Sequence, residues 1–336
     1  MMRYLPEGGY CMPNVVDCWL EAETAVGFRT FYSLHLRSLK KIKVIHGSAD
    51  RLLGQISKTF LDRGRQHIRW HSVYAPDLMT GLVVPSLETG WIAADVVRHI
   101  EVPRTLVVES VQAGPDMPLN PELDHLYLRI KRCLSGALAA LSEYDLLMPA
   151  GPRLDELVRE WVAEYIPEIR RHNGSGPQDW HGFGTPLTAL GPDAELLSLE
   201  FSRLQRTIHL EGGSSLTHTQ LVRRFSEQAL MRGYKVRFYH DALEPSRIDH
   251  LVIPALSLGI TNATAPHQVA GGHRIERILA GTRTSLGIED TEYWWGVFQK
   301  LYTQAWRLMQ QAADLKRATA GEAVQDLSKL TAQCTA

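Results

Sequence analysis

The stretch Arg63–Gly90, "RGRQHIRWHSVYAPDLMTGLVVPSLETG", occurs a second time in altered form at Arg232–Gly259, "RGYKVRFYHDALEPSRIDHLVIPALSLG". The two copies lie 169 residues apart and align without a gap, and nine of the 28 positions are identical. Average residue usage would give about two identities. Each copy begins with an Arg-Gly pair typical of a helix C-cap. Each continues as a strand ending in His, a proline-containing turn and a second apolar strand. The chain is therefore predicted to contain a duplicated α/β unit.

The residues before each copy agree in kind. Residues 41–64 and 206–233 each predict a strand, a glycine turn and a helix. Apolar residues recur in both helices with the spacing of one buried face, as at Leu52, Ile56 and Phe60. A strand, a glycine turn, a helix and a parallel strand form a βαβ unit with a right-handed crossover. We therefore predict an α/β fold of two tandem domains, each a parallel sheet with helices on both faces.

Composition limits the classes of protein that this chain can represent. It has 336 residues, a net charge of −1 and four cysteines without a CxxC pair. The length allows two domains, and the absence of a concentrated basic face argues against a nucleic-acid partner. The cysteine pattern predicts neither structural zinc nor a disulfide framework. No apolar run has the length of a membrane span and the first residues lack a signal-peptide pattern, so we expect a cytoplasmic protein that does not contact a membrane.

A segment rich in Gly, Pro and Asn, "HNGSGPQDWHGFGTP", separates the two copies. Such a composition is typical of a linker. We predict a first domain at 1–172, a linker at 173–185 and a second domain at 186–336. Apolar stripes beyond each copy predict long packing helices, and the polar tail from about residue 318 is expected to fray.

The order of these segments resembles a bacterial family of predicted ATPases or nucleotide kinases built from two tandem P-loop domains. In that family a GGPGTGKST-like loop, a helix ending in ERG, a strand ending in YH, a DPDSLD-like turn, a VIIPEL-like strand and an IxDxTAPH-like segment follow one another in each half. The second half follows this pattern closely, with "MRGYKVRFYHDALEPSRIDHLVIPALSLGITNATAPH" at Met231–His267. The first half, at Asp62–His99, is a weaker copy. The resemblance implies two P-loop NTPase-like domains.

The same resemblance identifies a candidate nucleotide loop at Glu211–Gln220, "EGGSSLTHTQ". A P-loop binds phosphates through backbone N–H groups at a helix N-terminus, a lysine, and a Ser or Thr hydroxyl that holds Mg²⁺. Here Thr217 replaces a glycine, His218 replaces the lysine, Thr219 keeps the hydroxyl, and Asn262 stands where the family has Asp. The implied ATP-binding residues are Gly212, Gly213, Ser214, Ser215, Leu216, Thr217, His218 and Thr219, with Thr219 as the Mg²⁺ ligand.

The corresponding turn of the first half is "HGSAD" at His46–Asp50. It is about four residues shorter than its partner, and no lysine follows it. Ala93 or Ala94 takes the place of the acidic residue. A loop this short cannot surround a triphosphate, so the first half is predicted to bind no nucleotide.

Other side chains with catalytic or ligand chemistry remain open to two interpretations. His218, Asp249 and His267 are the candidate catalytic residues; alternatively, His218 is an exposed residue at a helix start and His267 a turn residue. Asp241, Glu244 and Asp249 are expected between the two central strands of the second half, near the edge where α/β sheets bind ligands. They either bind a metal or a nucleotide base or belong to a solvated acidic loop. His67 and His71 share one face of a strand, but no acidic or cysteine partner recurs at metal-ligand spacing.

The loss of a lysine and of a metal-supporting Asp should leave little hydrolysis, because removing one preorganised charge typically costs about 10²–10³ in rate. We therefore predict a degenerate P-loop protein that binds ATP and Mg²⁺ weakly or not at all and has a binding or regulatory role, with a protein partner or through self-association. Two alternatives stay open. One is an active ATPase or nucleotide kinase that uses His218 in place of lysine, and the other is a scaffold for protein association.

Overall fold

The computed structural model describes residues 14–114, 120–148, 154–166, 179–183, 200–211, 214–262, 274–279, 288–319 and 327–335. The described elements of the first half are β1 (Val15–Cys18), β2 (Glu21–Thr24), β3 (Gly27–Thr30), α1 (Tyr32–Leu36), β4 (Lys41–Gly47), α2 (Ala49–Asp62), β5 (His67–His71), β6 (Met79–Val84), the 3-10 turn η1 (Pro85–Leu87), β7 (Thr89–Ala93), α3 (Ala94–Val97), β8 (Val107–Ala113), α4 (Pro121–Leu147) and α5 (Leu154–Tyr165). Those that follow are β9 (Asp179–Phe183), β10 (Arg206–Glu211), α7 (Ser215–Met231), β11 (Val236–His240), β12 (Ile248–Ile253), η3 (Pro254–Leu256), β13 (Leu258–Asn262), β14 (Arg274–Leu279), α8 (Ile288–Thr319) and α9 (Leu327–Thr335).

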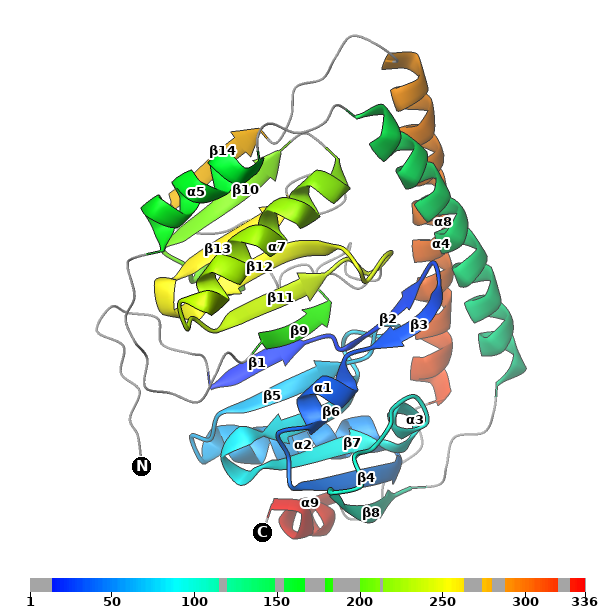
Figure 1. Ribbon diagram of the computed structural model, residues 1–336. Coiled ribbons are helices and arrows are strands. Elements are labelled where there is room, and N and C mark those ends of the chain that lie inside the picture. The colour runs from blue at the N-terminus through cyan, green and yellow to red at the C-terminus, as the bar shows by residue number, and fades with distance from the viewer. Residues whose placement is uncertain are drawn as a thin grey trace.

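Two sheets with the same strand order form the centre of the molecule (Figure 1). Among the described strands, the first sheet has the order β1-β5-β6-β7-β4-β8 and the second has the order β9-β11-β12-β13-β10-β14. Their inner edges meet where Trp19 and Phe183 form an isolated antiparallel bridge, with the Phe183 N–H donating to the Trp19 carbonyl at 2.9 Å. The duplication seen in the sequence is thus matched strand for strand, and the prediction of an α/β fold is confirmed.

The sheets are mixed, so the prediction of purely parallel sheets is wrong. β6 and β12 run antiparallel to both of their neighbours, whereas β4 pairs in parallel with β7 and β8. The reason lies in the turns at 72–78 and 241–247, which join β5 to β6 and β11 to β12. They are too short for the crossover that a parallel pair requires.

The turns around the sheets repeat as closely as the strands. Glu88 and Ser257, 169 residues apart, both have a left-handed backbone, with φ of 50° and 48°. The carbonyl of each accepts hydrogen bonds from two successive N–H groups at the start of a strand, β4 in one half and β10 in the other. The duplicated unit therefore preserves its backbone hydrogen bonds as well as its order of elements.

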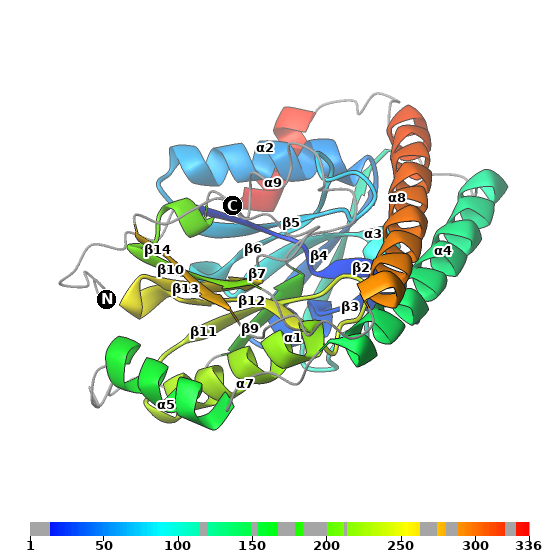
Figure 2. The same ribbon diagram turned by 90° about the horizontal axis from the view of Figure 1, so that it is seen from above.

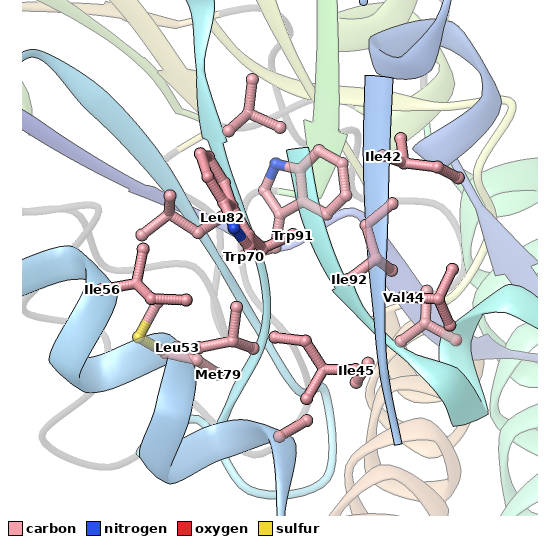
Figure 3. Close-up of a cluster of buried hydrophobic side chains, with 14 of the residues drawn as sticks. Ile42, Val44, Ile45, Leu53, Ile56, Trp70, Met79, Leu82, Trp91 and Ile92 are labelled. Atoms are coloured by element: carbon pink, nitrogen blue, oxygen red, sulfur yellow. The ribbon is translucent and has the colours of Figure 1, made fainter. Parts of the chain in front are cut away.

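Apolar side chains from α2 and the first sheet form one core (Figure 3). Leu52, Ile56 and Phe60 are fully buried on one face of α2, as their spacing predicts. Trp70 and Trp91 lie in the same core, and Gly81 makes room for Trp70, because a Cβ there would lie 2.5 Å from the indole ring. Burial of each such side chain stabilises the fold by roughly 1.5–3 kcal/mol.

The long helices connect the halves crosswise. α4 and α8 lie side by side in opposite directions (Figures 1 and 2). α5 then packs on α7 of the second half, where Trp161 contacts Phe225, and α9 packs on α2 of the first half, where Arg63 donates to the Thr335 carbonyl. Each half is thus covered by a helix that follows the long helix of the other half.

This exchange does not coincide with the expected division into 1–172, 173–185 and 186–336. α5 precedes residue 172 but lies on the second sheet, and α9 follows residue 186 but lies on the first. β9 lies within 173–185 and forms the inner edge of the second sheet rather than part of a linker. The polar tail, expected to fray, contains α9. Composition along the chain does not reveal on which sheet a segment packs.

Candidate functional site

Helix α7 begins inside the stretch that is predicted to be a phosphate-binding loop. Ser214 is its N-cap, and the Ser214 Oγ accepts a hydrogen bond from the Thr217 N–H at 3.1 Å. The His218 N–H donates to the Ser214 carbonyl at 3.1 Å. Two of the amides that a P-loop would offer to phosphate are therefore used in the first helical turn. Gly212 and Gly213 lie outside the described residues.

A carboxylate from α4 occupies the anion position at the start of α7. Asp145 accepts hydrogen bonds from the Ser215 N–H at 3.1 Å and from the Ser215 hydroxyl at 2.6 Å. The Arg247 guanidinium donates to the same carboxylate at 2.8 Å and to the Ser215 hydroxyl. Because a helix N-terminus carries partial positive charge, Asp145 satisfies the electrostatic role that a phosphate has in a P-loop.

Arg247 is the buried cation of this cluster. Its side chain and that of Asp145 are 9% and 10% exposed, and a second ion pair joins it to Glu244 at 2.8 Å. Burial opposes the charge of Arg247, but the carboxylates of Asp145, Asp241 and Glu244 outweigh this and raise the pKa of Arg247 above its ordinary value. The cluster is thus charge-compensated from within the chain.

His218, expected at an exposed helix start in one interpretation, is 1% exposed. Its Nδ1 lies 3.1 Å from Asn262 Oδ1, and the Asn262 amide donates to Asp249 Oδ1 at 3.5 Å. The exposed interpretation is wrong because the first turn of α7 packs against the end of β13. The three side chains come from α7, β13 and β12, so the structure brings two of the candidate catalytic residues, His218 and Asp249, together. His267, the third, lies outside the described residues.

The Thr219 hydroxyl, which the resemblance implies as a Mg²⁺ ligand, accepts a hydrogen bond from the Ile248 N–H at 3.2 Å. Asp50 occupies the same position in the first half and accepts from the Met79 N–H at 2.7 Å. In both halves this side chain ties the helix to the antiparallel strand. Within the described residues, no group of three or more His, Cys, Asp and Glu side chains is arranged to hold a metal ion.

The glycine turn of the first half is closed by backbone. Gly47 has φ of 81°, and a Cβ there would lie 2.5 Å from the carbonyl oxygen of Gly114. α2 begins at Ala49, so the Gly114 backbone lies against the turn that leads into this helix. The turn at Gly47 is therefore in close backbone contact with the segment that follows β8.

A buried polar cluster that the sequence did not predict lies beside the first sheet, around Glu21 and Glu23. Glu21 accepts hydrogen bonds from the Tyr32 hydroxyl at 2.9 Å and from the Val73 N–H at 3.1 Å. Burial raises the pKa of Glu21 to about 7, although the charge of Lys316 and these hydrogen bonds partly oppose it. Glu23 bonds the Tyr74 hydroxyl. Acidic residues that alternate within the apolar run "WLEAET" were the available signal.

The two histidines considered as metal ligands are engaged in hydrogen bonds. His67 contacts the Ser57 hydroxyl at 2.8 Å and the Arg65 carbonyl at 3.0 Å. His71 contacts Asp17 and the Pro76 carbonyl, both at 2.7 Å. Both side chains therefore have structural partners.

Comparisons of the chain with protein-family models, with curated proteins and with solved structures found no match. Across the part of the chain that is described, no helix combines the length and the apolar character needed to cross a membrane.

Proposed function

We propose that this chain is a P-loop NTPase-like protein in which both phosphate positions are closed from within, and that it has a binding or regulatory role with little or no ATP binding. The observation that carries the proposal is the Asp145 carboxylate on the N-terminus of α7, held there by Ser215 and Arg247. The order of segments resembling tandem P-loop domains supports the choice of family.

The groups that would serve a nucleotide have other bonds. The Ser215 N–H donates to the Asp145 carboxylate, and the Thr217 N–H donates to the Ser214 hydroxyl. The Thr219 hydroxyl accepts a hydrogen bond from the Ile248 N–H. A phosphate entering this site would meet the Asp145 carboxylate and would have to break the buried Asp145–Arg247 pair. Breaking such a pair costs about 3–5 kcal/mol, which lowers an affinity by roughly a hundredfold to several thousandfold.

A second candidate function is an ATPase or nucleotide kinase that becomes competent when the end of α4 moves away. Arg247 favours this alternative, because its guanidinium would then be a cation beside the α7 N-terminus and could replace the charge of the missing lysine. Asn262 in place of the metal-supporting acid argues against efficient hydrolysis.

Calorimetric titration with ATP and Mg²⁺ distinguishes the two candidates. The wild type is expected to show no binding at millimolar nucleotide. Asp145→Asn removes the negative charge while keeping the shape of the side chain, so it should bind the nucleotide more tightly than the wild type. Asp77→Asn, which removes an exposed carboxylate paired with Arg317, is the matched control and should leave binding unchanged.

One result of the same titration would contradict the closed-site proposal. Micromolar ATP binding by the wild type, abolished by the double change His218→Ala and Thr219→Ala, would overturn the closed-site proposal and support the enzyme. Circular dichroism of each variant checks that a lost signal does not come from unfolding.

A further inference from the structure

Among the described strands, β8 forms the outer edge of the first sheet. Within the part of the chain that the structure describes, β8 pairs with β4 and with no other strand. Val107, Val108, Glu109 and Ser110 are all exposed, and the two valines are 57% and 51% exposed. Because successive residues of a strand point to opposite faces, β8 is accessible from both faces as well as along its edge.

The chemistry of this edge differs from that of a protected one. Natural edge strands avoid pairing with other chains through proline, lysine, bulges or a covering segment. β8, "VVESVQA", contains no proline and no lysine, and its pairing with β4 is continuous in register from Val107 to Ala113. Its one charged side chain, Glu109, forms an ion pair with Lys41 at 2.5 Å. The edge therefore offers an apolar, charge-compensated template for an extended partner.

The direction of the hydrogen bonds defines the free groups of β8. The Val107 N–H donates to the Lys40 carbonyl at 3.0 Å, so Val107 faces inward. In a parallel ladder, alternate residues turn their N–H and C=O groups toward the same neighbour. The outward-facing residues are therefore Val108, Ser110 and Gln112.

The outward N–H and C=O groups of these three residues can pair with the same groups of a second copy of β8. In an antiparallel pair centred on Ser110, Ser110 lies opposite its own copy and Val108 lies opposite Gln112. These are the positions that exchange both N–H···O bonds, so every outward group of this segment finds a partner. Glu109 lies opposite Val111, so no like charges face each other directly across the strands.

We propose that β8 is an interface strand, through which two copies of this chain pair antiparallel about a twofold axis at Ser110. The two first-half sheets then form one continuous sheet across the dimer. This surface is separate from the start of α7, and the proposal does not depend on whether a nucleotide binds there.

Light scattering coupled to size-exclusion chromatography tests the proposal over a wide range of protein concentration. The wild type is expected to form a dimer. Ser110→Pro should weaken the dimer at least about tenfold, because proline removes the central outward N–H while such a position tolerates proline in an edge strand. A second variant, Val108→Lys, should weaken it in the same direction. Leu128→Lys, on α4 and 49% exposed, is the matched control and should leave the dimer intact.

Disulfide trapping tests the register. Ser110→Cys, in a background with Cys11 and Cys133 changed to alanine, should form a covalent dimer under mild oxidation. Opposed Cα atoms in such a pair lie about 5.5 Å apart, within the range of a disulfide. Leu128→Cys should cross-link far more slowly. A wild type that is monomeric throughout, a dimer insensitive to both β8 variants, or equal cross-linking of the two cysteine variants would each overturn the proposal.

Discussion

His71 and His240 end equivalent strands of the two halves, β5 and β11, and each places its Nδ1 2.7 Å from the carbonyl of a turn proline, Pro76 or Pro245. Their second ring nitrogens differ. His71 Nε2 lies 2.7 Å from the Asp17 carboxylate, whereas His240 Nε2 lies 2.9 Å from His181 Nδ1. The duplicated backbone has thus been kept while the charge around the same side chain has been changed.

The two sites favour opposite charge states of their ionisable side chains, as the pKa shifts of Asp17 and His240 show. Both ring nitrogens of His71 lie within hydrogen-bond distance of oxygen atoms, those of the Pro76 carbonyl and the Asp17 carboxylate. Burial tends to raise the pKa of Asp17, but the hydrogen bonds and charges of His71 and Arg69 outweigh it and hold this pKa below its usual range. In the second half, burial and the neighbouring His181 lower the pKa of His240 to about 4. The first site therefore favours the charged form of Asp17, and the second favours the neutral form of His240.

The same contrast extends to the ends of the long helices. α4 brings Asp145 to the buried Arg247 of the second half, and α8 brings Arg317 to the exposed Asp77 beside the first sheet. The corresponding turns of the two halves, 72–78 and 241–247, thus take part in ion pairs of opposite polarity and unequal burial. These differences can be tested by comparing the stability of variants in the first half with that of variants in the second half.

The largest effect is expected at the buried pair. Arg247→Ala leaves Asp145 and Glu244 without their cation and should lower the free energy of unfolding by about 3–5 kcal/mol. Arg317→Ala removes the exposed cation and should cost about 0–1 kcal/mol. Urea unfolding of both variants measures the difference. Similar losses would contradict the view that only one helix end is held by a buried pair.

The next effect is a pH dependence of opposite sign in the two halves. Glu21 has a folded pKa of about 7, above its unfolded value, so its contribution is complete at low pH and is lost as pH rises through about 7. His240 has a folded pKa of about 4, below its unfolded value, so stability is lost as pH falls from the unfolded value toward 4. Each term amounts to about 3 kcal/mol.

Urea unfolding across the pH range checks these signs. Glu21→Gln should flatten the loss of stability between about pH 5 and 8, and His240→Gln should flatten the loss between about pH 6.5 and 4. If both variants changed the same arm of the profile, the assignment of opposite signs to the halves would be refuted.

A smaller effect is expected at the closed turn of the first half. Gly47→Ala places a Cβ against the Gly114 carbonyl at a positive φ and should destabilise the protein by about 2–3 kcal/mol. Gly54→Ala, on α2 with no atom within 4 Å of the added Cβ, should stabilise it by about 0.5–1 kcal/mol. Thermal unfolding measures both. A neutral Gly47→Ala would show that the turn is not tightly closed.

Much of the fold can be predicted from the repeat in the sequence. The 169-residue offset relates the strands β5, β6 and β7 to β11, β12 and β13, the helix α2 to α7, and even the hydrogen-bonding side chains Asp50 and Thr219. Local periodicity determines which residues of α2 face the core, because one face of a helix must be buried. The antiparallel direction of β6 and β12 could also have been inferred, since the turns before them are too short for a crossover.

Only part of the candidate site could be predicted from the sequence. His218 and Asn262 stand in the sequence where the resemblance to tandem P-loop domains predicts a lysine and an acid, but the hydrogen bond between their side chains could not be predicted. Asp145 lies far from Ser215 in sequence and reaches it because α4 crosses to the other half. No periodicity or motif encodes that contact.

By itself, the sequence determined the duplication and the α/β class, because these depend on local patterns and residue identity. Only the tertiary structure decided that α5 and α9 cover opposite halves, that Asp145 fills the start of α7, and that Gly114 closes the turn at Gly47. Such contacts join segments distant in the chain, and they depend on where whole helices and strands end in space.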